Sequence, residues 1–186
     1  TAIDIGTTAV SLLLIDLTSG AVLARAAEYN GQIARGEDVI SRIIYATKND
    51  GRAHLQALVL ETINSLLVTA CARLQIAPDA IFKTVIAGNS TMIHLLLGIP
   101  AESIRLAPFV TAANPSPPLP AQTVGLHAHP QGAVDCLPGV ASYVGADITA
   151  GVLSSGVDAT DALTLFIDIG TNGEIVLGNR EWLLTC

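Results

Sequence analysis

The stretch Leu165-Phe-Ile-Asp-Ile-Gly-Thr-Asn-Gly-Glu-Ile-Val-Leu177 decides the fold that this sequence predicts. It reads as an apolar strand, a turn rich in Gly and small polar residues, and a second apolar strand. The chain opens with the same pattern, Ala2-Ile-Asp-Ile-Gly-Thr-Thr-Ala-Val10, followed by the apolar run Leu12–Ile15. One Asp-x-Gly-Thr sequence is compatible with an ordinary hairpin turn. Two copies between apolar strands favour an internal duplication, in which the two turns face each other.

Each copy offers groups that suit a metal-bound phosphate. The Asp at the end of the first strand can hold a hydrated Mg²⁺, and the Gly lets the backbone come close to a ligand. The Thr hydroxyl and the N–H groups of the turn can bind phosphate oxygens. The predicted metal ligands are Asp4 and Asp168, and the predicted phosphate contacts are Gly6, Thr7, Thr8, Gly170, Thr171, Asn172 and Gly173. For each Asp, a turn cap without a ligand is the alternative.

The composition argues against several classes of protein. The chain has 186 residues, of which 51% are hydrophobic, so it can bury a substantial core in one or two domains. A net charge of -7 without any basic run argues against nucleic acid and anionic membranes as partners. The apolar runs Leu12–Ile15 and Leu95–Leu97 are too short to span a bilayer. We expect a cytoplasmic protein, and the absence of a starting Met predicts a piece of a longer chain.

The cysteines and histidines do not suggest a metal site. Cys71, Cys136 and Cys186 are far apart, and they fit neither a Cys-x-x-Cys pair nor an iron–sulfur spacing. We expect buried or incidental thiols in a reducing compartment. His127 and His129 form a His-x-His pair in a predicted loop, where solvated histidines are more common than a metal pair.

The rest of the chain alternates strand and helix patterns, which predicts an α/β fold of the ribonuclease-H type with a mixed sheet. The predicted strands are Ala2–Ile5, Ala9–Asp16 and Ala21–Tyr29, as an antiparallel meander, followed by Ile81–Ala87 and Val134–Leu137. The predicted helices are Val39–Thr47 capped by Asp38, Arg52–Leu74, Met92–Leu97, and Ser142–Leu153 capped by Ser142. Proline removes backbone donors, so the Pro-rich segment 113–120 is expected to be a surface loop, with a partner-facing arm as the alternative.

Taken together, the two hairpins and the helix before the second one resemble the superfamily of sugar and acetate kinases, actin and heat-shock ATPases (ASKHA). In that superfamily the hairpins are phosphate motifs, one in each lobe. The segment Gly145–Gly151 is similar to the connecting helix of carbohydrate kinases, whose Asp acts as a catalytic base. The resemblance implies a ribonuclease-H-like, actin-like lobe with a mixed, five-stranded type of sheet and flanking helices. It also implies the first strands of a second, similar lobe.

Four longer segments narrow the resemblance to one family. They are Gly36–Ile43, Ala87–Gly98, Pro138–Asp147 and Asp168–Glu174. They resemble the reductive activators of corrinoid-dependent enzymes, which carry a 2Fe–2S ferredoxin-like domain ahead of an ATPase domain. The resemblance implies that ATP hydrolysis drives an electron onto the inactive Co(II) corrinoid of a partner and restores Co(I). It implies ATP and Mg²⁺ as cofactors, and a corrinoid protein or corrinoid-dependent methyltransferase as partner.

Two departures from the family pattern matter for this chain. It has no cysteine set for a cluster, so the 2Fe–2S group is expected only in a domain upstream. A second lobe needs about 100 residues, and the chain ends soon after the second hairpin. The predicted division is a first lobe over 1–137, a connecting helix and loop over 138–161, and the start of a second lobe over 162–186. The exposed edge of that short second sheet predicts pairing with another copy, hence a homodimer.

Three further polar residues are candidates for the site. Asp147 is a candidate base or water-orienting residue by analogy with the kinases, and a helix-capping or solvent-facing Asp is the alternative. Glu174 begins the strand after the second turn and could serve instead, or simply face solvent. Asn89 lies between a strand and a helix, where its side chain can contact phosphate or cap the helix. A small-molecule kinase and a non-catalytic, actin-like docking domain are the alternative functions.

Overall fold

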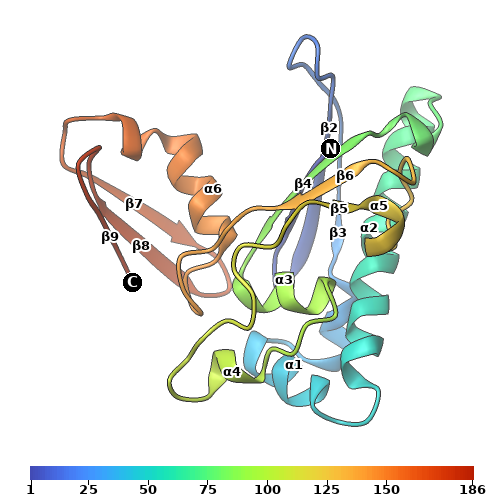
Figure 1. Ribbon diagram of the computed structural model, residues 1–186. Coiled ribbons are helices and arrows are strands. Elements are labelled where there is room, and N and C mark those ends of the chain that lie inside the picture. The colour runs from blue at the N-terminus through green and yellow to red at the C-terminus, as the bar shows by residue number, and fades with distance from the viewer.

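A computed structural model describes all residues, 1–186, and shows two β-sheets joined by helix α6 (Figure 1). The larger sheet has the strand order β3-β2-β1-β4-β6-β5, and the smaller sheet has the order β7-β8-β9. The strands are β1 (Ala2–Ile5), β2 (Ala9–Ile15), β3 (Val22–Tyr29), β4 (Lys83–Gly88), β5 (Leu119–Pro120), β6 (Ala133–Cys136), β7 (Thr164–Ile169), β8 (Gly173–Gly178) and β9 (Leu183–Thr185). The helices are α1 (Val39–Ala46), α2 (Gly51–Leu74), α3 (Ser90–Leu96), α4 (Glu102–Arg105), α5 (Ala121–Val124) and α6 (Ala146–Ser155), with short 3-10 turns η1 (Gly31–Arg35), η2 (Pro78–Ala80) and η3 (Val157–Ala159). This architecture confirms the predicted α/β class.

The larger sheet is mixed, as the sequence predicts. Strands β1, β2 and β3 pair antiparallel, and β4 pairs parallel with both β1 and β6. The expectation of five strands is wrong by one strand, because the end of the Pro-rich segment forms β5 against β6. Pro120 has no N–H to donate, and an edge strand such as β5 is one of the few places in a sheet where proline is tolerated.

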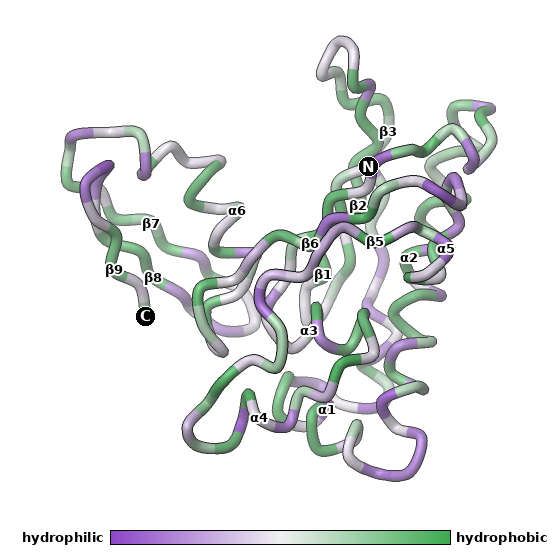
Figure 2. The backbone as a smooth tube through the Cα atoms, viewed as in Figure 1, coloured by the Kyte–Doolittle hydropathy of each residue, from purple (hydrophilic) through white to green (hydrophobic).

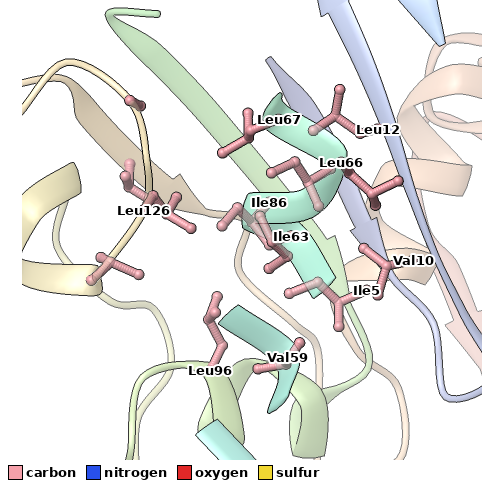
Figure 3. Packing of buried hydrophobic residues seen from close by; sticks show 14 of the residues in the cluster. Ile5, Val10, Leu12, Val59, Ile63, Leu66, Leu67, Ile86, Leu96 and Leu126 are labelled. Carbon is pink, nitrogen blue, oxygen red and sulfur yellow. The ribbon is translucent and has the colours of Figure 1, made fainter. Parts of the chain in front are cut away.

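The core lies on one face of the larger sheet, under α2 and α3. Along β1 the side chains alternate, so that Ile3 and Ile5 are buried while Asp4 points to the opposite face. The packing of sheet and helix side chains is shown in Figure 3, which labels Ile5, Val10, Leu12, Val59, Ile63, Leu66, Leu67, Ile86, Leu96 and Leu126. The burial of the isoleucines therefore fixes the face on which the Asp4 carboxylate is presented.

Helix α2 is long and apolar enough to cross a membrane, judged by length and composition alone. Its 24 residues exceed the short apolar runs on which the sequence-based expectation rests. The core helix of a soluble protein passes the same test. In this fold Leu55, Val59, Ile63 and Leu67 are buried in the main core, which accounts for the apolar character of the helix.

The connecting helix begins later than the sequence predicts. The expected start at Ser142 is wrong, because residues 141–144 form a tight turn in which Ala141 bridges to Val144. Helix α6 begins at Ala146 with Gly145 as its N-cap, and the Ser142 hydroxyl instead donates a 2.5 Å hydrogen bond to the carbonyl oxygen of Phe109. Asp38, by contrast, caps α1 in a reciprocal capping box with Ser41, as predicted.

The smaller sheet packs one face against α6. Phe166 and Val176 contact a small cluster around Val144 and Ile148, and a Cβ on Gly151 would lie 2.5 Å from the Phe166 ring. A side chain at position 151 would therefore require the Phe166 ring to move, so the glycine permits the close packing of α6 on β7. In Figure 2 the hydrophobic colour of β7 and β8 gives way to hydrophilic colour at the turn between them, residues 170–172.

Candidate functional site

The turns after β1 and β7 lie face to face, although they are far apart in the sequence. The hydroxyl oxygens of Thr8 and Thr171 are 3.2 Å apart, which joins the two turns directly. Between the turns is a cleft of about 690 Å³, a volume within the usual range for small-molecule sites. The cleft is lined by Asp4, Gly6, Thr7, Thr8, Ala9, Asn89, Asp147, Asp168, Ile169, Gly170, Thr171, Asn172 and Glu174.

The cleft therefore collects the site residues that the sequence predicts, with one exception. Gly173 does not line it, because this residue is the first of β8 and pairs with Ile169 in the ladder. Its role as a phosphate contact therefore stays a prediction that the cleft lining does not support. The roles of the other residues stay predictions, but the structure shows that these residues line one cleft.

Four carboxylates enter the cleft from four different elements or strand ends. Asp4 comes from the outward face of β1, and Asp147 from the first turn of α6. Asp168 near the end of β7 stands directly opposite Glu174 of β8 in the antiparallel register. A Cβ on Gly145 would lie 2.5 Å from the Cα of Asn89, so this glycine lets the start of α6 approach the larger sheet closely enough to deliver Asp147.

These carboxylates share one electrostatic environment. Removal from water raises the pKa of Asp4 to about 6, and the charges of Asp147 and Asp168 add to this increase. Desolvation also raises the pKa of Asp147, against the hydrogen bond that its carboxylate accepts from the Ile148 N–H, and Asp168 raises it further. Desolvation raises the pKa of Glu174, again with contributions from Asp147 and Asp168. A cation in the cleft would relieve this mutual repulsion.

The charge of the cleft lining fits a hydrated Mg²⁺ on a phosphate group. No Lys or Arg side chain lines it, so a polyphosphate needs a cation to enter among the four carboxylates. No group of three or more His, Cys, Asp or Glu side chains is close enough to form a protein-only metal cage. Mg²⁺ normally uses one or two carboxylates and completes its shell with water and phosphate oxygens. Asp4 and Asp168 are suited to that kind of coordination.

The first hairpin is held from behind by a buried polar cluster. The Asn30 side-chain amide donates to the carbonyl of Gly6 at 2.9 Å, and the Asn30 backbone N–H donates to the carbonyl of Thr8 at 2.9 Å. The guanidinium of Arg42 donates to the carbonyl of Thr7 at 2.5 Å. All three carbonyls of the turn therefore accept hydrogen bonds from the protein interior.

Asn89 has the role that the sequence offers as its alternative, that of a helix cap. Its side-chain oxygen accepts a 3.0 Å hydrogen bond from the Met92 N–H and so caps α3. The amide nitrogen of the same side chain donates to the Thr7 hydroxyl at 3.1 Å. Asn89 thus fixes the Thr7 side chain at the wall of the cleft, whether or not it also contacts a ligand.

The sequence-based reasoning missed the two residues that hold the first hairpin, Asn30 and Arg42. Arg42 lies in one of the four family-like segments and on the apolar stripe that Val39 and Ile43 form along α1. An arginine on an apolar stripe is a signal that could have been used, because a buried charge requires specific partners. Asn30 gives no such signal, since asparagine after a strand is typical of any turn.

Comparison with known proteins assigns the chain to a family. A family profile described as "RACo middle region" matches residues 1–160, which is most of the sequence. This chain belongs to that family. Residues 162–186 match a second profile, described as the "C-terminal domain of RACo the ASKHA domain". The transition between the two profiles falls in the loop before β7.

Two relatives cover nearly the whole chain. It is 40% identical over 181 residues to the corrinoid activation enzyme RamQ of Eubacterium limosum, covering 97% of this chain and 30% of the relative. It is 52% identical to a solved structure named "Reductive activator for corrinoid,iron-sulfur protein", with a TM-score of 0.97, covering 99% of this chain and 30% of that one. The chain therefore spans about a third of the length of these relatives.

Proposed function

We propose that this chain is the central part of a reductive activator of corrinoid proteins, and that its cleft binds Mg²⁺ and ATP. In the complete protein, hydrolysis of ATP would drive one electron onto an inactive Co(II) corrinoid of the partner and give Co(I). The electron would come from a 2Fe–2S cluster in a part of the protein outside this sequence. The names of the two relatives support the corrinoid partner.

The observation that carries the nucleotide part of the proposal is the meeting of the two hairpins. Phosphoryl transfer depends mostly on positioning and on stabilising charge at the transferred group. The two turns are in contact through Thr8 and Thr171, and the carboxylates Asp4 and Asp168 stand beside them. When bound, Mg²⁺ would supply positive charge to the phosphate oxygens, with Asp4 and Asp168 as its protein ligands.

The backbone of the turns is available for phosphate. The N–H groups of Gly6, Thr7 and Thr8 have no acceptor within the protein, and neither have those of Thr171 and Asn172. Unpaired N–H groups in a concave turn are a common way to bind phosphate. The two hydroxyls that now contact each other, on Thr8 and Thr171, would bind phosphate oxygens as well.

A water molecule that attacks the terminal phosphate needs a group to orient it and take its proton. Asp147 and Glu174 line the cleft beside the metal ligands and have pKa values raised by desolvation. A raised pKa makes a carboxylate a better base near neutral pH. We propose that these two carboxylates orient the water, with Asp147 delivered by the start of α6.

The test uses the complete protein that contains this chain, with purified corrinoid proteins. Phosphate release from Mg-ATP is measured alone, with a Co(II) corrinoid protein, and with sugars or small carboxylic acids. Stimulation by the Co(II) corrinoid protein is expected. Stimulation by a sugar or an acid would instead indicate a small-molecule kinase, and nucleotide binding without turnover would indicate a docking domain.

A further inference from the structure

We propose that Arg42 is a positioning residue for the nucleotide phosphates, although it lies behind the first hairpin and outside the cleft. It would hold the turn in the shape that receives phosphate and place a buried positive charge one backbone layer behind it. This inference rests on the proposed nucleotide site, and it adds a residue that lines no part of that site.

Arg42 is fully buried, with 0% of its surface exposed. Its Nε donates to the carbonyl of Gly36 at 2.9 Å, and one terminal nitrogen donates to the Gln32 side-chain oxygen at 3.2 Å and contacts the sulfur of Met92. The other terminal nitrogen donates to the carbonyl of Thr7 at 2.5 Å. Every nitrogen of the guanidinium therefore has a partner, and one of these partners is the carbonyl of Thr7 at the centre of the first turn.

These bonds determine which way the peptide groups of the turn face. The carbonyls of Gly6, Thr7 and Thr8 accept hydrogen bonds from Asn30 or Arg42 in the interior. A peptide group is planar, so its N–H and its C=O point in opposite directions. A carbonyl fixed inward turns the next N–H of the chain away from the interior. Arg42 fixes the carbonyl of Thr7 and therefore the N–H of Thr8.

The charge of Arg42 has no carboxylate to balance it nearby. The residue forms no salt bridge, and the nearest acidic influence on it is Asp38, which is exposed and occupied in capping α1. Burial lowers the pKa of Arg42 to about 10, which still leaves it charged at neutral pH. A buried unpaired cation is costly. A phosphate on the far side of the turn would supply the missing negative charge. Arg42 would in turn supply positive charge to a cleft whose lining has no basic residue.

A purely structural role makes a different prediction. If Arg42 only joined α1 to the hairpin, its loss would lower stability and weaken every ligand of the complete protein to the same extent. If it positions phosphate, its loss should weaken ligands that carry phosphate and spare those that do not. The comparison of Mg-ATP with adenosine separates the two cases.

The experiment uses the complete protein with Arg42→Met and Arg42→Lys. Arg35→Met serves as the control, because Arg35 is an exposed arginine that forms no hydrogen bond through its side chain. Dissociation constants for Mg-ATP and for adenosine are measured by calorimetry and saturation-transfer NMR, and folding by thermal unfolding. We expect Arg42→Met to weaken Mg-ATP by at least about tenfold, the scale of one hydrogen bond to a charged group. The affinity for adenosine should change less than about twofold, and Arg42→Lys should restore part of the loss, because it keeps the charge without the fork.

Several results would overturn the inference. One is an unchanged affinity of Arg42→Met for Mg-ATP, and another is an equal loss for Mg-ATP and adenosine. If Arg42→Met does not fold, Arg42→Lys decides, and a wild-type affinity for Mg-ATP in that variant overturns the inference. Failure of the wild-type protein to bind Mg-ATP would instead contradict the proposed function, so the two failures are distinguishable.

Discussion

The two hairpins share the sequence Asp-Ile-Gly-Thr, yet the protein holds them in different ways. In the first, Thr7 is 5% exposed, and the turn is tied to the interior by Asn30 and Arg42. The second projects from a small sheet, and its Ile169 is 86% exposed. Its turn is closed by a hydrogen bond from the Gly170 N–H to the carbonyl of Asn172, at 2.9 Å. The local sequence determines the turn, whereas tertiary contacts determine how firmly the turn is held.

This difference suggests that the two turns respond differently when a ligand binds. A turn held from behind is preorganised for its ligand, because its peptide groups need no rearrangement on binding. A turn that carries mainly its own hydrogen bond can adjust when a ligand binds, or when the smaller sheet moves relative to the larger one. We expect substitutions in the second hairpin to affect activity, and substitutions behind the first hairpin to affect stability as well.

The largest effect should come from the second hairpin. Asp168→Ala removes a proposed Mg²⁺ ligand without removing any contact of the core, so hydrolysis of ATP by the complete protein should fall by about 100-fold or more while the fold is kept. Phosphate release and thermal unfolding measure the two quantities. Asp158→Ala, which changes an exposed carboxylate away from the cleft, is the matched control. Activity within a few-fold of wild type in Asp168→Ala would remove the metal role from this residue.

The two hairpins also illustrate which features of the fold can be predicted from the sequence alone. The duplicated motif, the strand meander and the long helix were predictable, because alternation and helical spacing are local patterns. The duplication also predicted that the two turns face each other, and Asp4 and Asp168 do line the same cleft. The start of α6 was not predictable, because the turn at residues 141–144 depends on the contact between Ser142 and Phe109, which are distant in sequence.

The support behind the first hairpin was hidden for a related reason. The supporting side chains donate to backbone carbonyls of residues that are distant in the sequence; they are Asn30, Gln32 and Arg42. Every residue has a backbone carbonyl, so the sequence does not show which carbonyl will be an acceptor. The edge strand β5 was hidden because two residues form no pattern. The sequence therefore indicated which side chains line the cleft, and the structure was needed to find those that hold the first hairpin.

The next largest effect should appear in stability, on the side of the first hairpin. Asn30 is 1% exposed, and its side chain donates to the Gly6 carbonyl and accepts from the Gln32 N–H. Asn30→Ala leaves both groups without a partner, so the free energy of unfolding should fall by about 1–3 kcal/mol. Asn172→Ala is the matched change in the second turn, where the side chain is exposed and forms no hydrogen bond, and it should cost less than about 0.5 kcal/mol. Urea unfolding measures both, and equal losses would contradict the contrast between the turns.

The smallest effect concerns the carboxylate of the first hairpin and its dependence on pH. The pKa of Asp4 is about 6 in the folded protein, above its ordinary value of 3.8, because of desolvation and the charges of Asp147 and Asp168. The folded state therefore binds the proton more tightly than the unfolded state does. The stability that Asp4 contributes is fully present below pH 3.8 and is lost as the pH rises through about 6. This slope is opposite to that of a carboxylate that is stabilised in its charged form.

Asp4→Asn should remove that slope, since asparagine does not titrate. The stability of the variant relative to wild type should rise between pH 4 and pH 6 and become level above pH 7. Asp16→Asn is an informative control, because hydrogen bonds from Ser19 and Thr18 lower the pKa of Asp16, and the relative stability of that variant should fall with pH. Carbon-detected NMR of the Asp4 carboxyl group gives the pKa directly. Since Asp147 is one source of the increase, Asp147→Asn should lower the pKa of Asp4, and an unchanged value would mean that the two carboxylates do not share the cleft electrostatically.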